Sequence, residues 1–392
     1  MKKIFFLILL VIFAYFASPW SGWLRFFEKR GANVINDYLY NLSDNWKEWL
    51  LSFSWFLYSN IDEDFLTGYK DSLLNSHVLL LQSYEISDPG ILKTFKNAVD
   101  SGTNLRILTE SSRPYQWINA FKELKTYFQG TMAQIRSDEH LSTQYLHDNF
   151  VITSSGFWIQ TADLSTDWLT KNRDYFLFSD NPQIMTSLRY IFERDWIGDE
   201  IDADRIEPNL VVCNLNCRAI ITDLITNAKE SIVLQMEDIS DPSIYALLSE
   251  KPSEIVYKEN DYGRIVTWDF EFKAIFPNSK DNKLIADVFW TWNVRLLKKP
   301  NSHTKMMVID HKWLLIWSMN FNHESLDTNR EIWLLIDDPT VIERFLSWFN
   351  EDWRSMDRYY CPYGWCDEGA SLDFLNKTKK WEKRWWFWDV FY

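Results

Sequence analysis

Glycine is the residue that this sequence most obviously lacks. It occurs 11 times in 392 residues, whereas average usage of about 7% would give roughly 27. Tryptophan is in excess by a similar amount, with 22 residues. The deficit and the excess nearly cancel, so an explanation of one has to account for the other.

Positive charge is also in short supply, because the formal net charge is −14. Phosphate backbones recruit lysine and arginine, so this balance disfavours a general nucleic-acid binder and leaves room only for a local basic site. The chain is 46% hydrophobic and 24% charged, which is typical of a folded protein. Its length exceeds one typical core and predicts two domains or a duplicated pair.

Cysteine occurs four times, as two pairs. Cys213 and Cys217 lie in VVCNLNCR, and Cys361 and Cys366 lie in YYCPYGWC. Two pairs are compatible with zinc, disulfides or free thiols. No histidine accompanies them and the spacings are loose for zinc, so disulfides are favoured if the protein is exported.

The N-terminus predicts a membrane-targeting helix. Lys2 and Lys3 precede an apolar run over residues 4–17, as in a signal peptide. Tyr15 and Phe16 make a poor cleavage site, so an uncleaved anchor is the alternative, and a buried core helix is the third interpretation. We expect a membrane-anchored or secreted protein whose body lies outside the cytoplasm.

An internal repeat divides the rest of the chain. The segment HVLLLQSYEISDP at 77–89 matches SIVLQMEDISDP at 231–242. In both, a short apolar run predicts a buried strand, and Asp before Pro predicts a helix start. A second strand is expected at 104–108 (NLRIL) in the first half and at 293–297 (NVRLL) in the second.

The repeat gives five predicted segments. They are a signal peptide or anchor (1–30), a connector (31–76), a first lobe (77–200), a second lobe (208–355) and an unassigned tail (356–392).

Polar residues recur at matched places in the two halves. The second half carries His303, Lys305 and Asp310 in the spacing His-x-Lys-x4-Asp, then Ser318-x-Asn320 and Asn329-Arg-Glu331. The first half carries His147, Thr161-x-Asp163 and Asn172-Arg-Asp174, and the interval from Thr161 to Asn172 equals that from Ser318 to Asn329, 11 residues.

This combination resembles the HKD signature of the phospholipase D superfamily. The His-x-Lys-x4-Asp spacing alone is weak, and the downstream Ser-x-Asn and Asn-Arg-Glu make the resemblance specific. It implies an α/β fold of two tandem duplicated lobes, each a mixed sheet flanked by helices. It also implies cleavage or exchange of phosphodiesters through a phosphohistidine, with neither a metal nor a cofactor.

The resemblance assigns roles to residues of both halves. In the second half Glu331 is expected to be the partner of the His303 imidazole, and either histidine remains open as the nucleophile. The catalytic set is His303, Lys305, His147, Glu331 and Asp174; the phosphate ligands are Ser318, Asn320, Thr161 and Asn149; the supporting residues are Asp310, Asn329 and Asn172.

The first half departs from the family pattern. Asn149 stands where the family has lysine, and it lacks the charge that lysine brings to phosphate. Asp163 replaces the family's asparagine and would repel an anion. We predict that His147 takes part in the chemistry, and the alternative is a degenerate lobe with a weak or dead site.

Three tryptophans occupy positions where relatives favour glycine: Trp292, Trp317 and Trp333. Glycine beside a phosphate donor lets the backbone approach closely. Since some bacteria read the UGA stop codon as glycine, these residues are hypothesised to be glycines that were translated as tryptophan. The alternative is a tryptophan-rich lineage with a blocked site.

The resemblance and the N-terminal segment together predict an enzyme that hydrolyses or transfers the phosphatidyl group of phospholipids. Its expected partners are a phospholipid substrate and, through the N-terminal segment, a membrane. A nuclease of the same superfamily is the runner-up, followed by a cardiolipin-synthase-like transferase. A catalytically dead lipid- or partner-binding protein is the non-enzymatic alternative, and the oligomeric state stays open.

Overall fold

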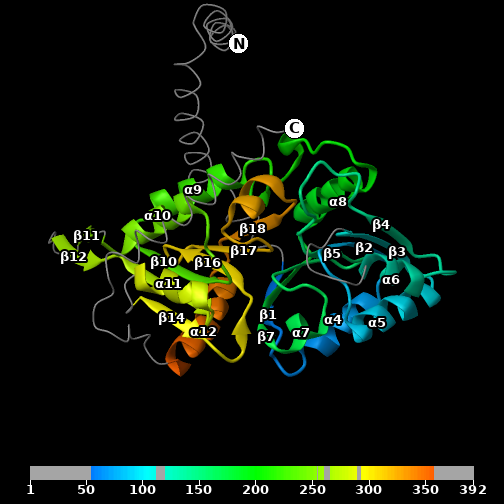
Figure 1. Cartoon of the computed structure of the whole chain (residues 1–392), viewed down its shortest axis with the longest axis horizontal. Coiled ribbons are helices and arrows are strands. Elements are labelled where there is room, and N and C mark those ends of the chain that lie inside the picture. The colour runs from blue at the N-terminus through cyan, green and yellow to red at the C-terminus, as the bar shows by residue number, and fades with distance from the viewer. Residues whose placement is uncertain (1–53, 112–119, 254, 260–264, 289–292, 357–392) are drawn as a thin grey trace, which may run out of the picture. The chain divides into compact units, whose positions relative to one another are not determined.

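Two seven-stranded mixed sheets dominate the computed structural model (Figure 1). The model describes residues 54–111, 120–253, 255–259, 265–288 and 293–356. The first sheet and its helices form the first lobe, and the second sheet and its helices form the second lobe.

The first sheet is parallel at one end and antiparallel at the other. Its strands are, in order across the sheet, β1 (Trp55–Ser59), β8 (Tyr175–Ser179), β6 (Phe157–Gln160), β5 (Phe150–Ile152), β2 (Val78–Ser83), β3 (Asn104–Thr109) and β4 (Gln134–Ser137).

The second sheet repeats this pattern of parallel and antiparallel pairs. Its strands, listed to match the first sheet, are β9 (Leu210–Val212), β18 (Ile332–Ile336), β17 (Trp313–Trp317), β16 (Lys305–Ile309), β10 (Ser231–Met236), β13 (Glu271–Pro277) and β14 (Val294–Leu297). Each strand therefore has one counterpart, and the predicted duplicated α/β fold is confirmed.

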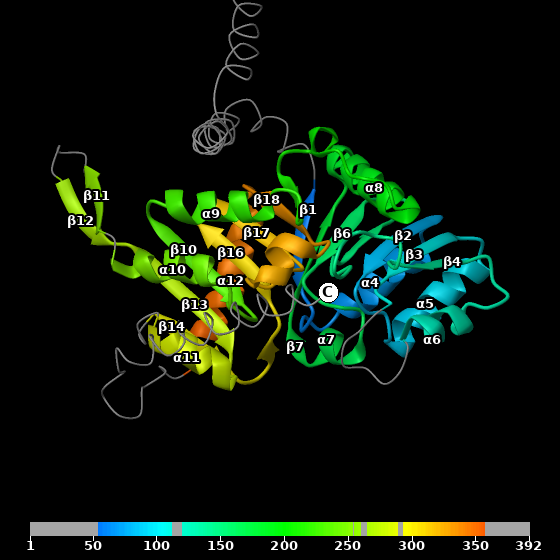
Figure 2. The same cartoon turned by 45° about the horizontal axis from the view of Figure 1, so that its top comes forward.

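One predicted counterpart was wrong. We matched NLRIL at 104–108 with NVRLL at 293–297, but the strand that pairs with β10 as β3 pairs with β2 is β13. The segment NVRLL contains β14, the counterpart of β4. The second lobe inserts a hairpin of β11 (Ile255–Glu259) and β12 (Ile265–Asp269) before β13. Because of this insertion, the sequence match fell on the strand after the true counterpart of β3. Figure 2 shows this hairpin extending away from the sheet of its lobe.

Helices fill the connections between strands. Those of the first lobe are α4 (Phe65–Leu74), α5 (Pro89–Asp100), α6 (Ala120–Tyr127), α7 (Thr166–Thr170), α8 (Pro182–Ile197) and a 3-10 turn at Ala203–Arg205. Those of the second lobe are α9 (Cys217–Asn227), α10 (Pro242–Glu250), a 3-10 turn at Lys251–Ser253, α11 (Lys280–Val288), a π-helical turn at Glu324–Thr328 and α12 (Pro339–Ser355).

The Asp-Pro pairs start helices as predicted. Asp88 accepts a hydrogen bond from the Ile91 backbone N–H at 2.8 Å, and Pro89 takes the first helical position of α5. Asp241 caps α10 in the same way, through the backbone N–H of Ile244 at 3.1 Å. A carboxylate at this position satisfies otherwise unpaired N–H groups, and proline there loses no hydrogen bond.

Three hydrophobic clusters hold the lobes together. One lies between the first sheet and α4 and α5, and the second lies between the second sheet and α9, α10 and α11. The third draws buried residues from both sheets and from α8 and α12, including Phe150, Met306 and Phe345. The two lobes therefore share one apolar core, and Figure 1 shows α8 on the face of the first sheet opposite α5.

The first lobe begins earlier than predicted. Part of the predicted connector at 31–76 forms β1, which pairs antiparallel with β8 from Trp55 opposite Ser179 to Ser59 opposite Tyr175. The next helix, α4, buries Phe65, Tyr69 and Leu73 against the sheet. Over residues 54–76, the described part of this stretch, the aromatic residues follow no single period because β1 and α4 follow each other within a few residues.

Several predictions fall outside the described residues: the N-terminal helix, the tail at 357–392, Cys361, Cys366 and Trp292. Among the helices that the structure does describe, none is both long enough and apolar enough to cross a bilayer.

Candidate active site

The two motif histidines stand at equivalent places, just before β5 and β16. The backbone N–H of His147 donates to the carbonyl of Arg330 at 2.9 Å, and that of His303 donates to the carbonyl of Arg173 at 3.2 Å. Short parallel pairings surround both contacts: Leu146 with Arg330, and β15 (Asn301–Ser302) with β7 (Asn172–Arg173). Each histidine is thus held by the Asn-Arg-acidic segment of the other lobe.

The carboxylates that contact the two histidines also come from the opposite lobes. Nδ1 of His147 lies 3.0 Å from Oε2 of Glu331, and Nδ1 of His303 lies 3.0 Å from Oδ1 of Asp174. Our expectation that Glu331 is the partner of His303 was therefore wrong. Because each Asn-Arg-acidic segment pairs with a strand of the opposite lobe, its acidic side chain reaches the opposite histidine.

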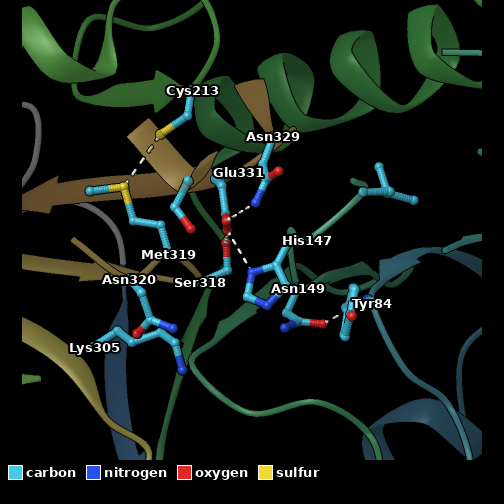
Figure 3. Close-up of polar contacts among 12 residues, drawn as sticks. Tyr84, His147, Asn149, Cys213, Lys305, Ser318, Met319, Asn320, Asn329 and Glu331 are labelled. Carbon is cyan, nitrogen blue, oxygen red and sulfur yellow. Dashed lines mark hydrogen bonds and ion pairs between the residues drawn. The ribbon is translucent and has the colours of Figure 1, made fainter. Parts of the chain in front are cut away.

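The predicted hydroxyl ligands orient these carboxylates. Ser318 donates to Oε2 of Glu331 at 2.7 Å, and Thr161 donates to Oδ1 of Asp174 at 2.6 Å. Asn329 adds a 3.3 Å hydrogen bond to Oε1 of Glu331. The two halves differ here, because the amide of Asn172 donates instead to the backbone carbonyl of Asp167. Figure 3 shows the cluster of Ser318, Asn329 and Glu331 beside His147.

The contacts distinguish the two imidazoles. A carboxylate accepts the Nδ1–H of each ring, which leaves Nε2 to act. Nε2 of His303 accepts a hydrogen bond from Nζ of Lys305 at 2.8 Å, as an unprotonated nitrogen with a free electron pair does. For His147, burial lowers the pKa, but the charge and hydrogen bond of Glu331 outweigh it, so the net pKa shift is upward. The raised pKa favours the protonated form of His147, which is the form that a general acid needs.

Lys305 is fully buried and shares its site with an acidic residue that sequence reasoning missed. Glu237, just after β10, lies 3.0 Å from Nζ of Lys305 and 3.4 Å from Nε2 of His303. Its Oε2 also accepts from the amide of Asn320 at 3.1 Å. Glu237 follows the repeated Leu-Gln, so the alignment of the two halves could have drawn attention to it, with Tyr84 as its counterpart.

Asn149 occupies the counterpart position of Lys305. Its Nδ2 donates to Oδ1 of Asp163 at 2.9 Å, and its Oδ1 accepts from the Ser83 hydroxyl at 2.7 Å and the Tyr84 backbone N–H at 3.3 Å. A buried neutral amide here keeps Asp163 hydrogen-bonded without adding a positive charge. The first lobe thus contributes a histidine without a lysine, and the cation of the site is Lys305 of the second lobe.

An aromatic ring covers each imidazole. Trp168 of α7 stacks on His303 with ring centroids 3.9 Å apart and planes 27° apart. Tyr84 packs against His147 with centroids 4.6 Å apart. Such rings fix the orientation of the imidazole planes. Neither aromatic residue belongs to the motif, and sequence reasoning missed both.

Buried Gln-Asp-Arg networks support both Asn-Arg-acidic segments. In each, a glutamine from one lobe and an arginine from the other meet one aspartate near the end of a long helix. The members are Gln82, Asp195 and Arg330 (3.1 and 3.1 Å), and Gln235, Asp352 and Arg173 (3.4 and 2.6 Å). The repeated Leu-Gln and Asp-Trp pairs were the available sequence signals for these networks.

Asp310 lies apart from the histidines. Its carboxylate accepts hydrogen bonds from the backbone N–H groups of Lys229, Glu230 and Ser231, the shortest at 2.7 Å. It therefore fastens the turn before β10 to the end of β16.

Trp317 and Trp333 face away from the site. They are cross-strand neighbours on β17 and β18, both are fully buried, and their rings meet edge-to-face at 6.0 Å. Because side chains alternate along a strand, Ser318 points to the site while Trp317 points into the core under α9. The expectation that Trp317 blocks the pocket is thus wrong.

Cys213 and Cys217 form a disulfide in the same core.

Comparison with known proteins agrees with this geometry. A family model described as "Cardiolipin synthase, PLD-like domain" matches residues 72–196 and 221–353, one stretch in each lobe. No curated protein matches the sequence.

Two solved structures share the fold. Phosphatidylserine synthase from Haemophilus influenzae Rd KW20 aligns with a TM-score of 0.58 at 12% identity, over 84% of this chain and 93% of that one. Polyphosphate kinase from Porphyromonas gingivalis aligns with a TM-score of 0.56 at 15% identity, over 84% of this chain. This chain covers only 56% of that kinase. With both lobes matched by one family model, the chain belongs to the cardiolipin synthase, phospholipase D-like domain family.

Proposed function

We propose that the protein is a phosphodiesterase that hydrolyses or transfers the phosphatidyl group of phospholipids. The observation that carries the proposal is the exchange of carboxylates: each histidine has its Nδ1 engaged by an acidic residue of the other lobe, at 3.0 Å in both cases. Two imidazoles prepared in this way supply the nucleophile and the acid that a metal-independent displacement requires.

His303 is the proposed nucleophile. Its Nε2 electron pair attacks phosphorus, and the bond from phosphorus to the leaving oxygen breaks. His147 donates its Nε2 proton to that oxygen, which leaves as an alcohol. Water or a second alcohol then attacks the phosphohistidine, gives its proton back to His147, and releases His303.

The neighbouring residues stabilise charge and orientation. Lys305 contacts His303, and Asn320 shares the partner Glu237 with Lys305. Both residues supply hydrogen bonds to the non-bridging oxygens. Glu331 and Asp174 hold the Nδ1–H tautomers and stabilise the imidazolium forms. Figure 3 shows Lys305 and Asn320 on one side of this site, with His147 and Asn149 on the other.

A phospholipid is the substrate that the whole chain favours. The formal net charge of −14 disfavours a long polyanion, and the apolar run at residues 4–17 would bring the body to a membrane. The membrane-anchored or exported location is part of the same proposal.

The experiment compares three labelled substrates: cardiolipin, phosphatidylcholine and single-stranded DNA. Purified protein is assayed beside His303→Ala and, as a matched control, His311→Ala. His311 lies in the same motif segment but contacts Glu271 on the surface. We expect lipid turnover that His303→Ala lowers by about 10²–10⁴ and that His311→Ala leaves intact. Cleavage of DNA alone would overturn the lipid assignment, and binding without turnover on any substrate would favour a pseudoenzyme.

Addition of a primary alcohol or glycerol to the same assay separates hydrolysis from transfer. At a fixed alcohol concentration, a transferase converts most of the lipid to a new phosphatidyl alcohol, whereas a hydrolase gives mainly phosphatidic acid. Acid-labile labelling of wild-type protein during turnover, absent from His303→Ala, is the expected signature of the phosphohistidine.

A further inference from the structure

Glu237 holds a position that the proposed chemistry does not explain. Its Oε2 is the common partner of Nζ of Lys305 at 3.0 Å, Nδ2 of Asn320 at 3.1 Å and Nε2 of His303 at 3.4 Å. These are the groups proposed above to hold and attack a phosphate. One carboxylate oxygen thus lies where a non-bridging phosphate oxygen would be bound.

Lys305 has no proton left for another ligand in this arrangement. An ammonium group has three donors. They face Nε2 of His303 at 2.8 Å, the carbonyl of His303 at 2.9 Å, and Glu237 at 3.0 Å. An incoming phosphate oxygen therefore has to displace one of these acceptors, and Glu237 is the acceptor whose side chain is partly exposed to solvent.

Glu237 is charged in this arrangement. Burial raises its pKa, but the charge of Lys305 and the hydrogen bonds from Lys305 and Asn320 outweigh burial and hold the pKa at about 2. Its side chain is 30% exposed, whereas that of Lys305 is fully buried. The carboxylate can therefore swing toward solvent while the lysine stays, and the two charges remain neighbours when a ligand is bound.

The first lobe has no such carboxylate. The repeat puts Tyr84 at the position of Glu237, and Tyr84 packs on His147 instead. Around His303, Glu237 thus already balances Lys305 before a phosphate arrives, and Asp174 adds a second carboxylate at the other ring nitrogen. A singly charged phosphate meets limited repulsion there, whereas the second charge of a monoester adds to the repulsion from both carboxylates.

We propose that Glu237 is a specificity-determining residue that selects singly charged phosphodiesters and rejects doubly charged phosphomonoesters and free phosphate. The proposal rests on the phosphodiester function proposed above. It implies that Glu237 weakens the binding of a monoester product, such as phosphatidic acid, and so helps to release it.

The test measures binding rather than turnover. Dimethyl phosphate, a diester with one charge, and methyl phosphate, a monoester with two charges above its second pKa of about 6, are titrated by ³¹P NMR at about pH 8. We expect wild-type protein to bind the diester at least about tenfold more tightly than the monoester. In Glu237→Gln the monoester should gain affinity until the two ligands differ by less than about threefold.

Glu271→Gln is the matched control, because Glu271 also pairs with a lysine and a histidine, Lys273 at 2.6 Å and His311 at 2.9 Å, outside the site. It should keep the wild-type ratio. Thermal unfolding checks that each variant is folded, and Glu237→Ala replaces Glu237→Gln if the latter is not.

The outcomes separate the two proposals. If both esters bind and the ratio is the same in wild type and in the Glu237 variant, the role of Glu237 is overturned and the phosphodiester site stands. If neither ester binds the wild-type protein or the variant, the phosphodiester site itself is overturned, and the role of Glu237 with it.

Discussion

Nδ1 of His147 lies 3.0 Å from Oε2 of Glu331, although the two residues are 184 positions apart and belong to different lobes. The equivalent contact of His303 with Asp174 spans 129 positions. For both of these histidines, the carboxylate at Nδ1 therefore comes from the other lobe. The site depends on the contact between the lobes as much as on the motif residues.

Double-mutant cycles should detect the exchanged pairing. We expect His147→Gln and Glu331→Gln to be coupled in urea unfolding by about 0.5–3 kcal/mol, because they contact each other. His303→Gln and Glu331→Gln should add nearly independently. Strong coupling of Glu331 with His303 and none with His147 would contradict the pairing described here.

The stability contributed by His147 should depend on pH. Its pKa is raised in the folded protein because Glu331 outweighs burial, so the folded state binds the proton more tightly than the unfolded state. The stabilisation is fully present below the ordinary histidine pKa of about 6.5 and is lost as pH rises through the folded-state pKa.

We therefore expect the free energy of unfolding lost in His147→Gln to be larger at about pH 5.5 than at about pH 9. Urea unfolding at both pH values measures the difference. His77→Gln is the control, because His77 is exposed and its loss should matter little at either pH. A loss that grows with pH would show that the imidazole is bound in its neutral form.

The buried Arg173–Asp352 pair should be costly to break. Both side chains are less than 10% exposed, and Arg173 donates twice to the carboxylate, at 2.9 and 2.6 Å. Asp352→Ala leaves a buried guanidinium uncompensated and should lower the free energy of unfolding by about 3–5 kcal/mol. Asp167→Ala, which breaks the exposed Lys171–Asp167 pair, should cost less than about 1 kcal/mol. Similar losses in the two variants would argue against a supporting network.

Lys305 should matter to turnover beyond its packing. Lys305→Met keeps the length of the buried side chain and removes the charge, so we expect kcat of the proposed reaction to fall by about 10²–10³. Asn149→Ala, at the counterpart position, should lower it less, because Asn149 carries no charge. Steady-state kinetics on the same lipid decides this, and equal losses would mean that the lobes contribute alike.

The codons of Trp317 and Trp333 form a prediction about the gene. The Nε1–H of Trp317 is buried without a hydrogen-bond partner among the described residues, and such a group costs about 1–3 kcal/mol. Together with the scarcity of glycine, this favours UGA codons read as glycine at both positions. The DNA sequence, or mass spectrometry of the native peptide, gives the answer, and UGG at both positions would end the hypothesis.

Much of the fold was predictable because each element of the repeat is specified by a short, continuous stretch of sequence. Examples are the buried strands β2 and β10 and the capped helices that follow them. The sequence also predicted that the side chains of His303 and Lys305 lie on the same side, because residues two apart in a strand share one face.

The exchanged partners were not predictable from spacing. The spacing between Ser318 and Glu331 does not reveal whether Glu331 contacts His303 or His147, because that contact depends on how the two lobes pair. Asp195 and Asp352 stayed hidden for a related reason: each lies on a helix, and its partners lie on distant strands and in the other lobe. Glu237 was identified as a site residue only from its side-chain contacts in the structure.

The parallel pairing of β7 with β15, matched by that of Leu146 with Arg330, has a consequence for ancestry. Two equivalent surfaces that each complete the other are what a two-fold symmetric homodimer presents. A single-lobe ancestor with this geometry would have been inactive as a monomer and complete as a dimer. In a chain that carries both halves, one half can lack the lysine, as the first lobe does at Asn149, because the other half supplies it.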